Sequence, residues 1–217
     1  MTLHLEPIVS DLAHVLLLVA LLSYLGSKVF DAWLGPQRGA LAGFSIGAFL
    51  SILPEPVNPA FYTRAIIGDP GALGWVFLIA LLLKSVWRKD WLSQRESRLL
   101  ALVAFAGAVS IYPGSLGVPG APDFYNSNLG GFLLPSVTLG FALFAIWRGF
   151  FISAAAAGSG LALYGLDLHE SANLWDCLID FPSVLVSLVI LVRWASPFRR
   201  LRKARDAASL PTPPRSP

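Results

Sequence analysis

The chain has 217 residues, of which 55 % are hydrophobic and 13 % are charged, and its formal net charge is +3. Because soluble globular domains carry about 25 % charged residues, this composition excludes an ordinary soluble domain and indicates an integral membrane protein. The single cysteine, Cys177, excludes an internal disulfide.

A helix that crosses a bilayer needs about 20 mainly apolar residues. Several of the apolar segments are shorter than this, so we expect their helices to extend into the flanking loops. We predict an all-α integral membrane protein with about seven transmembrane helices in one domain, residues 1–197. The seven segments are Ile8 to Leu34, Gly39 to Leu53, Gly71 to Trp87, Leu99 to Tyr112, Gly131 to Trp147, Gly149 to Tyr164 and Phe181 to Trp194.

The distribution of Lys and Arg predicts the orientation, since basic residues concentrate in cytoplasmic loops. With the N-terminus outside and the C-terminus inside, 15 of the 16 Lys and Arg residues fall on the inner side and only Arg64 falls outside. The same orientation gives the outer face nine of the 13 acids. The basic balance therefore reflects topology, and no nucleic-acid partner is predicted.

The first segment carries Asp11 and His14 on one helix face near its outer end. The second has glycines every four residues, and the sixth is built almost wholly from Ala, Ser and Gly. Because small residues let membrane helices approach closely, we expect these two segments to pack at the centre of the bundle, with a substrate lane along them as the alternative. The expected packing glycines are Gly39, Gly43, Gly47, Gly158 and Gly160.

An internal repeat is predicted in the middle of the chain. GAFLSILP is followed by NPAFY and a helix ending in VWR, whereas GAVSIYP is followed by APDFY and a helix ending in IWR. Gly47 and Gly107 lie 60 residues apart, as do Trp87 and Trp147. With the last two segments as a diverged copy, the architecture becomes one helix plus three parallel-repeat hairpins that point outward.

The outer loops are rich in Pro, Gly and Asn, which favours ordered turns rather than helix. They place Tyr62, Tyr125 and Trp175 at the outer boundary, where aromatics commonly anchor a protein at the interface. A shared aromatic rim around an outer cleft is the functional alternative. The segment 198–217 is basic and then rich in Pro and Ser, and we predict a disordered cytoplasmic tail.

The densest polar chemistry lies in the stretch 165–182, GLDLHESANLWDCLIDFP. Asn173 is the expected N-cap of the following helix. A helix that starts there would place Asp176 and Asp180 on one face, four residues apart. The loop residues Asp167, His169 and Glu170 could turn toward the same point.

This stretch, together with Asp11 and His14, supports three hypotheses. The set could hold a metal such as Zn or Mn, or could supply a general acid and base from His169, Glu170, Asp176 and Asp180. Alternatively, the acids are solvated or cap helices, or they form a polar binding site with Asp167 and the aromatic residues. No HExxH spacing supports a metal, and no cofactor is predicted.

Several classes of protein are excluded. The chain has no Walker or dinucleotide-binding glycine motif, no CxxC, and no lysine in its last segment for a retinal Schiff base. We therefore expect a multi-pass protein of a bacterial inner membrane. As its function we predict a non-catalytic scaffold or accessory subunit with an acidic-aromatic outer cleft that binds a membrane-protein partner or a lipid. An outer-leaflet enzyme acting on lipid or glycan headgroups and a small-solute permease are the alternatives.

Overall fold

The computed structural model describes residues 6–54, 57–125, 132–171 and 173–196, and these residues form ten α-helices and no strand. The predicted tail, 198–217, lies outside the described residues. The all-α prediction is confirmed for the described part of the chain. The helices are α1 Glu6–Val29, α2 Asp31–Leu34, α3 Pro36–Ser51, α4 Pro59–Ile67, α5 Ala72–Trp87, α6 Gln94–Ser115, α7 Leu133–Trp147, α8 Phe151–Gly165, α9 Leu174–Leu178 and α10 Phe181–Ala195.

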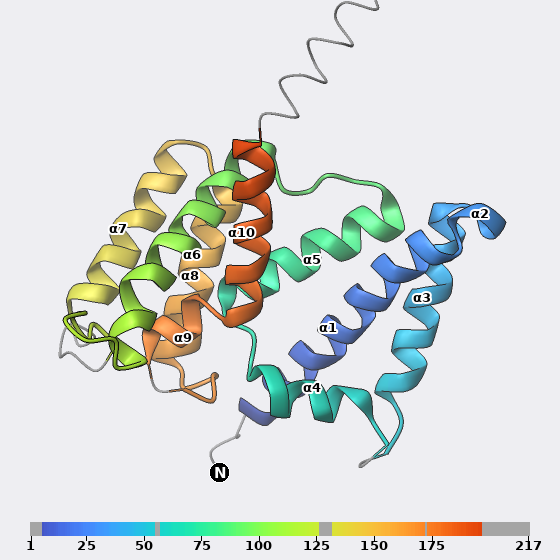
Figure 1. The fold of residues 1–217 in the computed structure, drawn as a ribbon, viewed down its shortest axis with the longest axis horizontal. Helices are drawn as coiled ribbons and strands as arrows, with labels where there is room; N and C mark the ends of the chain where they lie inside the picture. Colours follow the sequence, from blue (N-terminus) through green and yellow to red (C-terminus); the bar gives the residue numbers. More distant parts are fainter. Residues whose placement is uncertain (1–5, 55–56, 126–131, 172, 197–217) are drawn as a thin grey trace, which may run out of the picture.

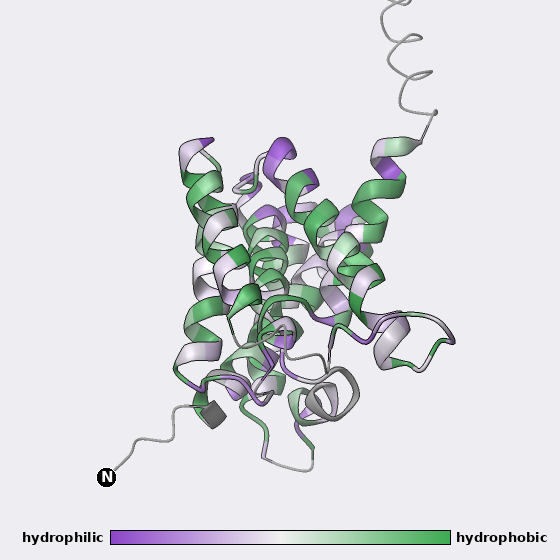
Figure 2. Cartoon of the chain, turned by 90° about the vertical axis from the view of Figure 1, so that its left-hand side faces the viewer, coloured by the Kyte–Doolittle hydropathy of each residue, from purple (hydrophilic) through white to green (hydrophobic). Residues whose placement is uncertain are grey.

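Among the described residues, two helices are long and apolar enough to cross a membrane, namely Ser10–Val29 within α1, and α6. Four further apolar helices, α5, α7, α8 and α10, have only 15 or 16 residues. The helix α6 extends beyond the predicted segment at both ends, as expected of a short apolar segment. Its N-cap is Ser93, whose side chain accepts from the Glu96 N–H. Figure 2 shows hydrophobic residues along the helices and hydrophilic residues mainly at their ends.

The helices form two groups joined by α5 (Figure 1). In one group α1 packs against α3, and in the other α6 packs against α10 while α7 packs against α8. The helix α5 runs diagonally between the groups and contacts α1, α8 and α10. We call the end formed by α4, α9 and the N-termini of α1, α5 and α10 the site end. The opposite end carries α2 and the N-termini of α6 and α8.

The glycine stripe of α3 lies against α1. A Cβ added at Gly39 or Gly43 would collide with the backbone of Gly26 or Leu22, and one at Gly47 would meet Val19. Small residues thus let the two backbones approach closely, as expected of packed membrane helices.

The expected pairing of the second and sixth segments is wrong. The helix α8 packs against α7 and α9, on the far side of α5 from α3. Its Gly160 faces Leu178 of α9, whereas Gly158 is exposed and a Cβ there would meet nothing within 4 Å. The small-residue face of α3 packs against α1, and that of α8 packs against α9. Close approach requires complementary surfaces, so two stripes of small residues do not by themselves predict a pair.

The structure corrects two further expectations, one on helix pairing and one on the first segment. Consecutive helices of the second and third predicted hairpins do not pack closely, since α6 pairs with α10 and α7 with α8. The first segment, expected as one helix from Ile8 to Leu34, breaks at Phe30 into α1 and α2.

The outer loop expected to contain only turns includes the helix α4. Asn58 starts it by accepting from the Ala60 N–H at 2.9 Å, and Pro59 occupies its first position. Proline is favoured at that position because its missing N–H would be unpaired there in any case. This helix carries Thr63 to the site described next.

Candidate functional site

Two polar cavities adjoin at the site end. The first, of about 340 Å³, is called the acidic pocket here. The second, of about 470 Å³, is called the side pocket and is lined in part by Asp11, His14 and Asn58. Glu170 is exposed and lines both cavities. The acidic pocket is lined by Gly68, Asp69, Tyr112, His169, Glu170, Ser171, Asp176, Ile179, Asp180 and Phe181.

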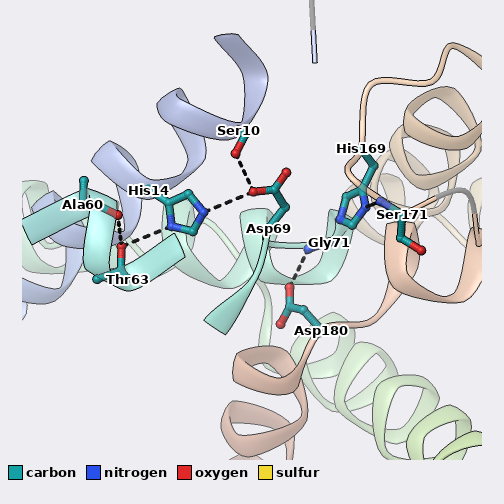
Figure 3. Close-up of polar contacts among 9 residues, drawn as sticks. All are labelled: Ser10, His14, Ala60, Thr63, Asp69, Gly71, His169, Ser171 and Asp180. Carbon is teal, nitrogen blue, oxygen red and sulfur yellow. Dashed lines mark hydrogen bonds and ion pairs between the residues drawn. The ribbon is translucent and has the colours of Figure 1, made fainter. Parts of the chain in front are cut away.

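The wall on the α1 side is built on a buried hydrogen-bond network (Figure 3). Ser10 Oγ donates to Asp69 Oδ1 at 2.5 Å, and His14 Nε2 lies 3.2 Å from the same oxygen. The Thr63 hydroxyl donates to the Ala60 carbonyl at 2.7 Å, and its oxygen lies 3.2 Å from His14 Nδ1. His14 therefore uses both ring nitrogens to connect α1 with α4 and with the start of α5.

Asp180, only 7 % exposed, forms the wall on the α10 side. Its carboxylate accepts from the Ser183 N–H at 2.5 Å as the cap of α10, and from the Gly71 N–H, at the start of α5, at 2.7 Å. Burial raises the pKa of this carboxyl above its usual range, while the N–H groups of Ser183 and Gly71 oppose that shift. A Cβ at Gly74 would collide with the same carboxylate, so glycine there permits the contact.

The segment between α4 and α5 thus connects both helix groups within three residues. Asp69 binds Ser10 and His14 of the first group, whereas the N–H of Gly71 binds Asp180 of the second. The acidic pocket lies over this junction, with walls from both sides. Any relative movement of the two groups would consequently change its shape.

Asp176 is held by a second network. Its Oδ2 accepts from the Tyr125 hydroxyl at 2.7 Å and from the Ser171 hydroxyl at 2.5 Å. Two hydroxyl donors on one oxygen fit an ionised carboxylate, which only accepts. The hydrogen bond to Asp176, followed by burial, raises the pKa of Tyr125, which keeps its phenol protonated as a donor.

His169 offers the pocket a donor. Its Nδ1 accepts from the Ser171 N–H at 3.1 Å, which in the neutral ring leaves the proton on Nε2. The Nε2 atom is buried and has no hydrogen-bond partner among the described residues. In Figure 3 this nitrogen is turned away from Ser171, toward the segment that contains Gly71.

Four other predicted site residues, Asp11, Tyr62, Asp167 and Trp175, do not line the acidic pocket. Asp11 is exposed in the side pocket, and Tyr62 is 51 % exposed and stacks edge-on with Phe61. Asp167 is exposed and outside the acidic pocket, with a φ of 49°. Trp175 packs into the apolar core instead of lining the pocket.

The expectation that Asp176 and Asp180 share one helix face is wrong. Asn173 does cap a helix, by accepting from the Trp175 N–H, but α9 ends at Leu178. Asp180 then adopts an extended backbone and caps α10. Both carboxylates nevertheless line the same pocket, because the chain turns around them.

Asp69, Ser10 and Thr63 are not among the site residues predicted from the sequence. Asp69 was counted only as one of the outer acids, although the Gly-Asp-Pro-Gly segment before a helix is a signal of a structured turn. Ser10 and His14 lie four residues apart on one helix face, which was the available indication that the face is polar and buried.

The geometry gives little support to metal binding or nucleophilic catalysis. Among the described residues, no three His, Cys, Asp or Glu side chains are grouped so that they could hold a metal ion. The Ser10 hydroxyl donates to Asp69 and not to His14, so it is not placed as a nucleophile activated by histidine.

In the part of the chain that the structure describes, the fold is all-helical, two helices are long and apolar enough to cross a membrane, and an acidic pocket lies between two helix groups. No family model, curated protein or solved structure matches the chain.

Proposed function

We propose that this chain is a multi-pass membrane protein without catalytic activity, an accessory or scaffold subunit that binds a cationic group of a partner protein or lipid in its outer cleft. The cleft consists of the acidic pocket and the side pocket. We place the protein in a bacterial inner membrane, and the distribution of Lys and Arg along the chain supports an orientation with the site end outside.

One observation carries the proposal. The acidic pocket contains Asp69, Glu170, Asp176 and Asp180, and none of its ten described lining residues is Lys or Arg. Carboxylates at a partly enclosed surface focus a negative potential, which attracts cations and disfavours anions.

The alternatives have weaker support. Nucleophilic catalysis requires a reactive group beside a base, whereas the hydroxyls of Ser10, Tyr125 and Ser171 donate to carboxylates. A permease along the small-residue faces of α3 and α8 is disfavoured because these helices lie on opposite sides of α5. The fixed carboxylates suit binding, since their positions are determined before a ligand arrives.

Thermal unfolding of the purified full chain in a nonionic detergent tests the proposal. A ligand that binds only the native state raises Tm. Tetralysine should raise the Tm of the wild type by several degrees, at about 2–4 °C per kcal/mol, and tetraglutamate should not. The double variant Glu170→Gln/Asp176→Asn should lose this response. An equal response to both peptides, or an unchanged response of the variant, would contradict the proposal.

A further inference from the structure

An apolar groove of about 340 Å³ lies between α6 and α7, on the side of the molecule away from α1 and α3. These two helices do not pack closely against each other, because α6 pairs with α10 and α7 with α8. The space between them is lined by Ala156 and Ala157 of α8 and, toward the site end, by Trp175 of α9. The lining residues Val103 of α6 and Val137 of α7 are exposed, so the groove opens between these helices.

The lining of this groove selects against charge. None of its 15 lining residues is charged, and the only hydroxyl groups among them belong to Thr138 and Ser153. Along α6 the groove extends from Leu100 to Gly107, in the middle of a helix long enough to cross a membrane. Moving a charge into an apolar site without a partner is costly, so the groove suits a neutral ligand.

Ser153 gives the groove one unsatisfied polar group. The residue is 0 % exposed, and its Oγ has no hydrogen-bond partner among the described residues. A hydroxyl that is buried without a partner is unfavourable. A buried water needs about two to four polar partners, more than this apolar lining offers. An apolar ligand that carries one oxygen would satisfy Ser153, because a hydroxyl both donates and accepts.

We propose that the groove binds one neutral single-chain amphiphile, a long-chain alcohol. Its hydroxyl pairs with Ser153 near the start of α8, and its alkyl chain runs along α8 toward Trp175 of α9. This site goes beyond the proposed function, since the groove shares only the lining residue Ile179 with the acidic pocket and none with the side pocket.

Native mass spectrometry of the full chain with dodecanol and with dodecane tests the role of the hydroxyl. Dodecanol should give a one-to-one adduct that is about fivefold or more tighter than that of dodecane, because only the alcohol forms the hydrogen bond. Ser153→Ala should bind both molecules equally. Ser159→Ala is the matched control and should keep the preference, since Ser159 lies on the same helix, does not line the groove and donates to the Ala155 carbonyl.

A second pair of variants tests the place of binding. Val137→Trp should fill the opening of the groove and weaken the dodecanol adduct at least tenfold. Leu139→Trp should leave the adduct unchanged, because Leu139 lies on the same helix and does not line the groove. Val137 and Leu139 are 59 % and 52 % exposed, so neither substitution disturbs the core.

Three results would overturn the inference. Equal binding of dodecanol and dodecane to the wild type, or a preference that survives in Ser153→Ala, would show that the hydroxyl does not select the ligand. An unchanged adduct in Val137→Trp would place the alcohol elsewhere. A phosphatidylglycerol adduct that dodecanol does not displace, but that Val137→Trp abolishes, would make a phospholipid acyl chain the occupant. The tetralysine response is measured separately, so the cationic cleft stands or falls independently of these results.

Discussion

The carboxylate of Asp69 connects three elements, through hydrogen bonds to Ser10 and His14 of α1 and, by way of His14, to Thr63 of α4. Hydrogen bonds to a charged group contribute about 1.5–3 kcal/mol each when buried. This residue therefore matters to stability as well as to the charge of the pocket.

Replacing Asp69 by asparagine should lower the free energy of unfolding by about 1.5–3 kcal/mol, because the buried partners lose a charged acceptor. Asp167→Asn is the control. Asp167 is exposed, and asparagine tolerates its positive φ, so that change should stay within about 0.5 kcal/mol. Denaturant unfolding in detergent measures both. Equal effects would show that the network around Asp69 is not stabilising.

Cys177 is fully buried in α9, and burial, followed by the charge of Asp176, raises the pKa of its thiol to about 11. At pH 8 only about one thiol in a thousand is then ionised, and the thiolate is the reactive form. Iodoacetamide should therefore leave the folded protein unmodified at pH 8. After denaturation, when the pKa returns to about 8.5, the thiol should react readily. The mass of the intact chain reports the modification, and fast alkylation of folded protein would show that α9 opens.

At the scale of the elements, two buried carboxylates each join two helix N-termini. Asp180 caps α10 and accepts from the start of α5. At the opposite end, Glu96 lies in the first turn of α6 and accepts from the Ile152 N–H of α8 at 3.0 Å. The N-terminal N–H groups of a helix have no intrahelical partner and favour negative charge, so one carboxylate serves two helices at each end.

Replacing Glu96 by alanine removes an acceptor from the starts of both α6 and α8. The expected loss of stability is about 1–3 kcal/mol. Because Glu96 lies at the end opposite the acidic pocket, the Tm increase caused by tetralysine should remain. A variant of normal stability, or one that loses only the tetralysine response, would contradict the role of Glu96 as a structural cap.

The seam between α1 and α3 provides a test of packing. Gly43→Ala should cost about 1–3 kcal/mol, because its Cβ would collide with the backbone of Leu22. Gly140→Ala in α7 is the matched control, since a Cβ there meets nothing within 4 Å. Alanine is the better helix former, so the control should gain up to about 1 kcal/mol. If both variants unfold at the same denaturant concentration, the close seam is not present.

The positions of most long helices, and several of their caps, could be predicted from the sequence. Apolar length located the helices, and Asn58, Ser93 and Asn173 are ordinary N-caps that local sequence signals can find. The pairing of helices could not be predicted in the same way. The small faces of α3 and α8 look alike in sequence, and only the shapes of α1 and α9 determine which face each one meets.

At the scale of the whole molecule, the site depends on contacts between distant parts of the chain. His169, Glu170, Asp176 and Asp180 were predicted from their local density, and all four line the acidic pocket. Gly71, whose N–H donates to Asp180, and Asp69, which also lines the pocket, lie about 100 residues earlier in the chain. Such a junction leaves no periodic pattern, so the sequence indicated one half of the pocket and not the half that joins the two helix groups.

The central claim is that this pocket faces the outer side and binds a cationic group. The rate at which a membrane-impermeant maleimide labels Phe181→Cys, with Cys177 replaced by alanine, tests both parts at once, because Phe181 is exposed, lines the acidic pocket and is not one of its carboxylates. In right-side-out vesicles the label should react rapidly, and tetralysine should slow the reaction at least tenfold. In inverted vesicles no reaction should occur. Labelling from the inner side, or a rate that tetralysine leaves unchanged, would contradict the account.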